Sequence, residues 1–141
     1  MTTEFEPAER IEAPIVTEKG VLCFVEGEKD IPFAIKRVFF ITDVSEGAVR
    51  GNHAMKTMRE VVFCIKGSVI ITLNDGQTTE DVHLEKPNEG LLIEPNQWRI
   101  LHDFAPDTVL LALVDTSYDP DDYIRDYQEF ENTYGLPTEG I

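Results

Sequence analysis

Short apolar runs rich in β-branched residues recur along the chain, and they constrain its fold more than any other feature. They include VLCFVE, KRVFFITDV, EVVFCIKGSVIITLND, LLIEP and TVLLALVD. Turn-forming Gly, Pro, Asn and Asp residues separate them, as in EGEKDIP, SEGAVRGN and KPNEG. Many short strands at close spacing indicate an antiparallel sandwich or barrel. The sequence therefore predicts an all-β fold.

Two turns and one helix can be placed within this pattern. Asn74-Asp75-Gly76 predicts a tight hairpin between two alternating strands, and Gly67 predicts a bulge or bend. The stretch DPDDYIRDYQEFEN predicts a short C-terminal amphipathic helix that begins near Asp119, with Pro120 in its first turn and aromatic residues at helical spacing. We expect these aromatic side chains to pack on the barrel. The 141 residues suit a single domain, residues 1–141, with a core from about 11 to about 131.

The charge of the chain excludes two classes of partner. Lys and Arg number 12 and Asp and Glu number 27, so the formal net charge is -15. Such a field repels nucleic acid and anionic membranes, and it admits a phosphate-bearing substrate only where basic residues converge. The first residues are polar and acidic, and no apolar run approaches the ~20 residues of a membrane span. A cytoplasmic location is the expectation.

One histidine and one glutamate stand at a spacing that resembles the first conserved motif of the cupin superfamily, G-x5-H-x-H-x3,4-E-x6-G. Here the positions are Gly47, His53, Met55, Glu60 and Gly67, with methionine in place of the second histidine. Residues i and i+2 of a strand point to the same face, so His53 and Met55 are expected to face the barrel interior. Glu60 would return from the neighbouring strand.

The second cupin motif also lacks its histidine. The stretch EGLLIEPNQWRILHDF supplies Gly90 and Pro95, but Arg99 stands where a ligand histidine is expected. Met55 is a weak metal ligand and Arg99 is a permanent cation that repels metal ions. We therefore predict no metal and no other cofactor, and a metal-dependent cupin dioxygenase is disfavoured.

A narrower resemblance covers the chain from about Ile11 to Phe130. It rests on IPFAIKRVFFI, RGNHAMK, GSVIITLNDG and GLLIEPNQWRILHDFAPDTVLLALVDTSYDPDDYIRDYQEF. These stretches resemble the sugar-nucleotide 3,4-ketoisomerases, the cupins with a WxcM-like C-terminal domain. The resemblance implies a jelly-roll barrel that works without metal as a homodimer and can exchange N-terminal strands. It also implies conversion of dTDP-4-keto-6-deoxyglucose to a 3-keto sugar, for deoxyamino-sugar and surface polysaccharide biosynthesis.

The resemblance assigns the chemistry to His53 as general base, against the alternative of a hydrogen-bonded core histidine. Met55 occupies the position of the family's second histidine, and Phe39 lies in a strand where the family carries a tyrosine, so two proton-handling groups are missing. Glu60 is a candidate replacement, because burial in a barrel raises the pKa of a carboxyl group. Alternatively, Glu60 forms an ion pair with one of the nearby cations, namely Arg59, Lys56 or Arg99.

Substrate binding requires cations for the diphosphate. Arg37 and Arg50 match basic positions of the family, and the planar guanidinium suits phosphate, although structural salt bridges are the alternative. Lys19 stands where relatives often carry arginine, and Arg99 replaces a histidine at the barrel mouth. Trp98 either stacks on a base or sugar or packs in the fold. The full set of predicted substrate-contacting residues is Lys19, Arg37, Phe39, Arg50, Asn52, Met55, Trp98, Arg99 and His102.

Two hypotheses for the function remain open at this point. The first is a working ketoisomerase with an altered proton relay, which acts on a nucleotide-linked 6-deoxyhexose. The second is a catalytically reduced cupin that binds a nucleotide sugar without turnover. Positions 53, 55 and 39 separate them, because only the isomerase requires proton-handling groups there.

Overall fold

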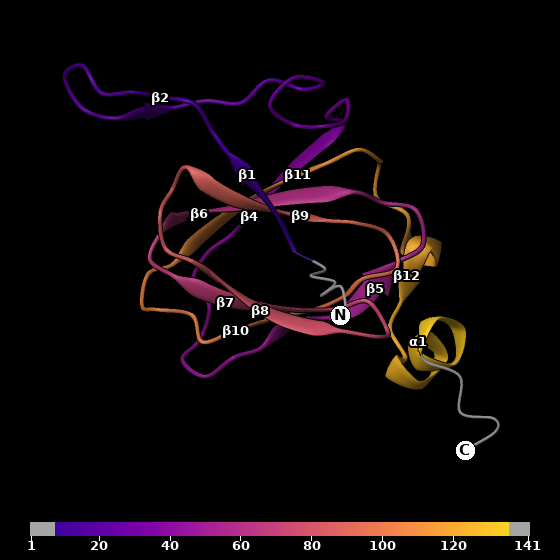
Figure 1. Ribbon diagram of the computed structural model, residues 1–141. Coiled ribbons are helices and arrows are strands. Elements are labelled where there is room, and N and C mark those ends of the chain that lie inside the picture. The colour runs from indigo at the N-terminus through magenta and orange to yellow at the C-terminus, as the bar shows by residue number, and fades with distance from the viewer. Residues whose placement is uncertain (1–7, 136–141) are drawn as a thin grey trace, which may run out of the picture.

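Two five-stranded antiparallel sheets face each other and enclose the core, as the computed structural model in Figure 1 shows. The structure describes residues 8–135. One sheet has the order β1-β9-β6-β11-β4, and the other has the order β12-β5-β10-β7-β8. The strands of the first sheet are β1 (Glu9–Glu12), β4 (Arg37–Ile41), β6 (Glu60–Lys66), β9 (Glu89–Ile93) and β11 (Val109–Val114). Those of the second are β5 (Arg50–Met55), β7 (Val69–Asn74), β8 (Thr79–Leu84), β10 (Trp98–His102) and β12 (Tyr123–Ile124). The predicted all-β jelly-roll architecture is confirmed.

The alternation of side chains along each strand builds the core between the sheets. On β7, Val69, Ile71 and Leu73 are buried while the residues between them are partly exposed. These side chains meet those of the opposite sheet, such as Val62 and Leu91, in one apolar cluster. Because successive residues of a strand point to opposite faces, this period-2 pattern fixes which side chains face the interior.

Both predicted turns are present. The hairpin between β7 and β8 turns through Asp75 and Gly76, and Gly76 has a φ of 97°. Gly67, with a φ of 83°, connects β6 to β7, and a Cβ atom there would lie 2.3 Å from Thr108 Oγ1. Only glycine fits this close approach in a left-handed backbone conformation.

The prediction that the C-terminal helix begins near Asp119 is wrong, because the segment divides into three elements. Asp119 caps a 3₁₀ turn (η1, Pro120–Asp122), β12 follows, and the helix α1 (Tyr127–Tyr134) begins only after its N-cap Asp126. Strand pairing explains the division. Tyr123 pairs with Met55 of β5, and this tertiary hydrogen bonding outweighs the helical periodicity of the local sequence.

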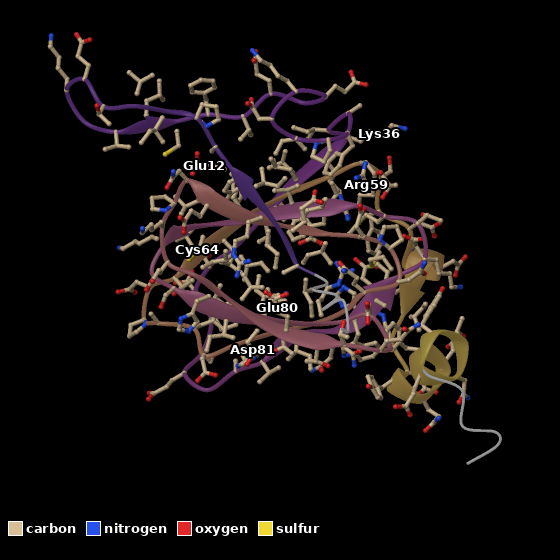
Figure 2. All side chains as sticks on the ribbon, viewed as in Figure 1. Glu12, Lys36, Arg59, Cys64, Glu80 and Asp81 are labelled. Carbon is tan, nitrogen blue, oxygen red and sulfur yellow. The ribbon has the colours of Figure 1, made fainter. Side chains whose placement is uncertain are left out.

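The two edges of the sandwich differ. On one edge Glu80 of β8 lies between the sheets and accepts a hydrogen bond from the backbone N–H of Ala8 at 3.3 Å, so it ties the two sheets together (Figure 2). On the opposite edge, β4 of one sheet faces β5 and β12 of the other. The largest polar side chains of the interior lie on this second side.

The N-terminal segment extends away from the sandwich. A separate two-stranded sheet, formed by β2 (Ile15–Val16) and β3 (Leu22–Cys23), projects from the body of the molecule in Figure 1. Its turn contains Lys19, which has a φ of 58°. Among residues 8–135, no helix is both long and apolar enough to cross a membrane.

Candidate functional site

A cavity of about 250 Å³ opens between the sheets on the side of β4, β5 and β12. Strands from both sheets line it, so its walls are part of the rigid framework of the sandwich. The lining residues are Phe39, Ile41, Arg50, Gly51, His53, Met58, Glu60, Arg99, Leu101, Tyr123 and Arg125. The predicted residues Phe39, Arg50, His53, Glu60 and Arg99 are therefore brought together, although they come from four different strands.

His53 points into this cavity in a defined tautomer. Its Nδ1 lies 3.1 Å from the carbonyl oxygen of Gly51. A carbonyl oxygen only accepts hydrogen bonds, so Nδ1 carries the proton and donates it. The lone pair is therefore on Nε2, which leaves a basic nitrogen for a ligand.

The surroundings of His53 keep this ring neutral. Burial, and then the positive charge of Arg99, lower the pKa of His53 from 6.5 to about 4, with a smaller contribution from Arg125. The hydrogen bond to Gly51 acts in the opposite direction. At neutral pH the imidazole is consequently unprotonated and can accept a proton, as a general base must.

Gly51 allows His53 and Arg99 to lie opposite each other. The two residues are register partners in the β5–β10 ladder, and the register shifts between Arg99 and Ile100. At Gly51 the φ is 86°, and a Cβ atom there would lie 2.8 Å from the carbonyl oxygen of Arg99. A Cβ atom at this position would clash with the backbone of β10, so the glycine permits the close approach of β5 and β10 beside His53.

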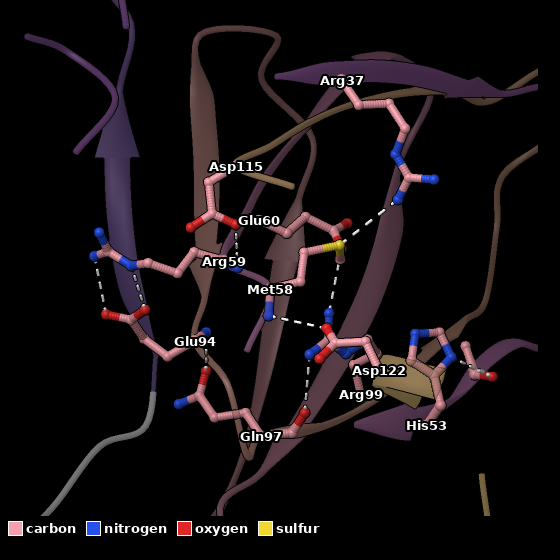
Figure 3. Close-up of polar contacts among 11 residues, drawn as sticks. Arg37, His53, Met58, Arg59, Glu60, Glu94, Gln97, Arg99, Asp115 and Asp122 are labelled. Carbon is pink, nitrogen blue, oxygen red and sulfur yellow. Dashed lines mark hydrogen bonds and ion pairs between the residues drawn. The ribbon is translucent and has the colours of Figure 1, made fainter. Parts of the chain in front are cut away.

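The interior glutamate is held by the interior arginine. Arg99 NH1 donates to Glu60 Oε1 at 3.2 Å and Arg99 NH2 donates to the backbone oxygen of Gln97 at 3.1 Å (Figure 3). The side chains of Arg99 and Glu60 are only 2% and 11% exposed. Burial raises the pKa of Glu60 and lowers that of Arg99, and each charge opposes the shift of its partner. Of the partners considered for Glu60, the structure selects Arg99.

The cavity is cationic in an otherwise acidic protein. The chain has six arginines and a formal net charge of -15. Three of the six, Arg50, Arg99 and Arg125, line this one cavity. The acidic residue in its lining is Glu60. Arg50 and Arg125 are exposed at its rim, while Arg99 is buried. Such a local reversal of sign in the field attracts anionic ligands.

Arg37 lies behind the wall of the cavity. Its NH2 group approaches Met58 Sδ at 3.6 Å, and its guanidinium lies 5.5 Å from the ring centroids of both Phe39 and Tyr118. Its charge opposes the rise in the pKa of Glu60. Within the described part of the chain, the buried Nε atoms of Arg37 and Arg99 have no hydrogen-bond partner, so both retain a donor.

Met55 does not line the cavity. It is 2% exposed and packs with Met58 and Val114, against which Phe39 and Tyr123 also pack. The inward position at the end of β5 is thus filled by apolar packing. Unlike Met55, Phe39 does reach the cavity, where its ring supplies shape without a hydroxyl group.

The other predicted contacts lie elsewhere. Asn52 and Trp98 are on the outer face of the second sheet, where Trp98 packs against Tyr127 and Phe130 of α1 at centroid distances of 5.1 and 5.5 Å. Of the two roles considered for Trp98, the structure supports packing. Asn52 and Trp98 border a separate groove beside α1 and do not reach His53.

His102 and Lys19 are also outside the cavity. His102 is bound through Nδ1 to Asp103 at 2.6 Å and through Nε2 to the hydroxyl of Thr72 at 2.7 Å, so it secures the end of β10. Lys19 is in the turn of the projecting β2–β3 sheet. Neither side chain lines the cavity.

Sequence reasoning missed six of the lining residues, and two of these six, Tyr123 and Arg125, carry a hydroxyl group or a charge. Tyr123 was assigned to the packing face of a helix and Arg125 had no assigned role. Both belong to the chain around β12, and β12 pairs with β5 beside His53. The guanidinium of Arg125 lies 4.1 Å from the centroid of the Tyr123 ring. No local signal in the sequence distinguishes two strand residues here from one helical turn.

The chain is similar to proteins of one known family. The family model described as FdtA: WxcM-like, C-terminal, matches residues 9–135. The chain is 39% identical over 117 residues to the TDP-4-oxo-6-deoxy-alpha-D-glucose-3,4-oxoisomerase of Aneurinibacillus thermoaerophilus, which covers 83% of this chain and 84% of that protein.

Solved structures give the same result. A sugar 3,4-ketoisomerase from Thermoanaerobacterium thermosaccharolyticum in complex with TDP has a TM-score of 0.89 and 37% identity, covering 93% of this chain and 96% of that chain. A 3,4-ketoisomerase from Helicobacter canadensis has a TM-score of 0.86 and 36% identity, covering 89% and 96% of the respective chains.

Proposed function

The chain belongs to the FdtA family of WxcM-like C-terminal domains, and we propose that it is a 3,4-ketoisomerase of a TDP-linked 6-deoxyhexose. Relatives at 36–39% identity carry this activity in their names, and one of them is in complex with TDP. The observation in this chain that carries the proposal is a neutral histidine with a free Nε2 inside an arginine-lined cavity.

We assign the base to His53. Moving a ketone from C4 to C3 requires removal of the proton at C3 and delivery of a proton to C4, with an enediol between the two steps. A neutral imidazole accepts the first proton and, once protonated, is an acid that can return it. The positive charges of Arg99 and Arg125 make the protonated ring a stronger acid, which favours the return.

We assign anion recognition to Arg50 and Arg125 at the rim, with Arg99 and Arg37 behind them. Guanidinium groups offer paired donors that match phosphate oxygens. Arg99 is already held by Glu60, so its Nε is oriented before a ligand arrives. In this arrangement Glu60 positions a cation, and its carboxylate is engaged in that ion pair.

The activity can be tested directly with TDP-4-keto-6-deoxyglucose in D₂O, followed by proton NMR. We expect conversion to the 3-keto isomer with deuterium incorporated at the exchanging carbon. TDP alone is expected to raise the melting temperature, since ligand at ~100-fold its Kd stabilises a protein by about 2.7 kcal/mol. Stabilisation by TDP without exchange or product would instead establish a cupin that binds nucleotide sugars without turnover. An absence of both effects would contradict either function.

We further propose that the protein is a homodimer assembled through its projecting segment. Large apolar side chains that are 41–68% exposed gather on that segment, and three more are 45–70% exposed on the first sheet. They are Ile15, Val16, Val21, Leu22 and Phe24 on the segment, and Val38, Phe40 and Ile65 on the sheet. Apolar surface of this extent favours a partner surface over solvent. The predicted contact of Lys19 with substrate would then depend on a partner protomer.

Glutamate at Leu22 is expected to convert the dimer to a monomer, because a carboxylate cannot be buried in an apolar interface without a partner. Sedimentation velocity of the wild-type and Leu22→Glu proteins would measure the change. Ile70→Glu, on the outer face of β7, is the matched control and should leave the mass unchanged. A wild-type protein that sediments as a monomer at micromolar concentration would contradict the proposal.

A further inference from the structure

The cavity contains one hydroxyl group that the sequence did not assign to it. Tyr123 lines the cavity from β12, and its ring centroid lies 4.9 Å from that of His53 at an interplanar angle of 59°. Strand pairing holds it there, because Tyr123 is the register partner of Met55, two residues along β5 from His53. The phenol therefore lies beside the base, on an element that packs against the base's own strand.

Ketoisomerisation requires more proton transfer than one imidazole provides. Besides the proton that moves from C3 to C4, a second proton must leave the hydroxyl oxygen at C3 and reach the oxygen at C4. A group that both donates and accepts through one atom suits this second transfer, and a phenol is such a group. Met55 and Phe39, which replace the proton-handling residues of the family pattern, have no exchangeable proton.

We propose that Tyr123 is the second proton-transfer residue of the reaction, acting on the two sugar oxygens while His53 acts on the two carbons. This inference rests on the proposed ketoisomerase function. In the first half, His53 Nε2 takes the proton from C3, the C–H electron pair forms the C3–C4 double bond, and Tyr123 protonates the oxygen at C4. In the second half, Tyr123 recovers a proton from the hydroxyl at C3, the C3 carbonyl forms, and His53 returns its proton to C4. Both side chains end in their starting states.

The charges around Tyr123 suit this role. Between the two halves the phenol is an anion, and it then lies close to two guanidinium groups. The guanidinium of Arg125 is 4.1 Å from the centroid of the Tyr123 ring. The second guanidinium is that of Arg99, which interacts electrostatically with Tyr123: this interaction raises the pKa of Arg99, whereas burial lowers it. Fixed cations at the site of a developing negative charge stabilise it without reorganisation. The same two cations also acidify the protonated His53, so one arrangement serves both residues.

The test replaces Tyr123 with phenylalanine, which keeps the ring and removes the hydroxyl. We expect kcat to fall by about 10²-fold or more, since positioned acid–base groups contribute about 10²–10⁴-fold, with the Kd for TDP changed less than about threefold. Tyr127→Phe is the matched control, because the Tyr127 hydroxyl binds Asn74 at 2.9 Å on the outer groove and should leave kcat unchanged. Adding Phe39→Tyr to the Tyr123→Phe variant is expected to restore part of kcat, because position 39 lines the same cavity.

The outcomes separate this inference from the function on which it rests. Wild-type turnover together with a Tyr123→Phe variant within about threefold of wild type would overturn the inference and leave the ketoisomerase intact. A variant that loses TDP binding and thermal stability along with kcat would show a packing role, which also overturns it. Absence of turnover in the wild-type protein, with its TDP binding retained, would overturn both.

Discussion

Asparagine in place of His53 is expected to lower kcat/KM by about 10²–10⁴-fold, because it removes the base that takes the proton from C3. The asparagine amide can still donate to the carbonyl oxygen of Gly51, so the local backbone of β5 is preserved, but no basic nitrogen remains at the position of Nε2. The Kd for TDP should change little, since the diphosphate contacts are assigned to Arg50 and Arg125. Steady-state kinetics and TDP titration of the same preparation measure the two effects separately.

Two further measurements support this test: a matched substitution at another histidine, and the pH dependence of the wild-type protein. His83→Asn, on the exposed face of β8, is the matched substitution and should retain full activity. The pKa of His53 is about 4, so kcat/KM of the wild-type protein should decline only below pH 5 and not near 6.5. Substantial turnover by His53→Asn would exclude His53 as the base, and an acid limb near 6.5 would contradict the neutral state assigned to it.

Alanine in place of Glu60 is expected to reduce the free energy of unfolding by about 3–5 kcal/mol. The substitution leaves the guanidinium of Arg99 buried at 2% side-chain exposure without its counter-ion, and breaking a buried pair from one side has costs of this size. The cavity that remains adds to the loss. Urea denaturation followed by far-ultraviolet circular dichroism gives the free energy, and a lower midpoint with an unchanged m-value would identify a stability effect.

Two further variants show whether the loss of stability comes from the burial of the ion pair. Arg59 and Glu94 also form an Arg–Glu pair, at 2.8 Å, but their side chains are 31% and 43% exposed. Glu94→Ala should therefore cost no more than about 1 kcal/mol. The double variant Glu60→Leu with Arg99→Met removes both buried charges and should recover most of the lost stability. Equal losses of unfolding free energy in Glu60→Ala and Glu94→Ala would contradict the burial of the Arg99 guanidinium away from solvent.

The position of His53 relative to Arg99 could be anticipated in part. Strand alternation correctly put His53 on the inner face. The expectation that Glu60 returns from the neighbouring strand is wrong, because β6 follows β5 along the chain but lies in the opposite sheet, so Glu60 reaches the cavity from across the sandwich. The ion pair between Glu60 and Arg99 was one of three alternatives, because sequence separation does not determine which cation faces a carboxylate across a barrel. The register of β5 with β10, together with the packing of the two sheets, decided it.

Trp98, Asn52 and His102 show the converse. Each lies within two residues of a cavity residue, and each points to the outer face because neighbouring residues of a strand alternate. Motif resemblance treats nearby residues together, whereas the pleat separates them to opposite sides of the sheet. Lys19 differs again, because its strands form a separate sheet outside the sandwich.

By itself, the sequence determined the class of fold, its turns at Gly67 and Gly76, and the family to which the chain belongs. These depend on local periodicity, on glycine conformation and on short motifs, all of which are written along the chain. Only the tertiary structure decided that Tyr123 and Arg125 join His53 in one cavity. The reason is physical: β12 consists of two residues whose conformation is set by pairing with β5, and that pairing is an interaction between segments more than sixty residues apart, which local propensity does not encode.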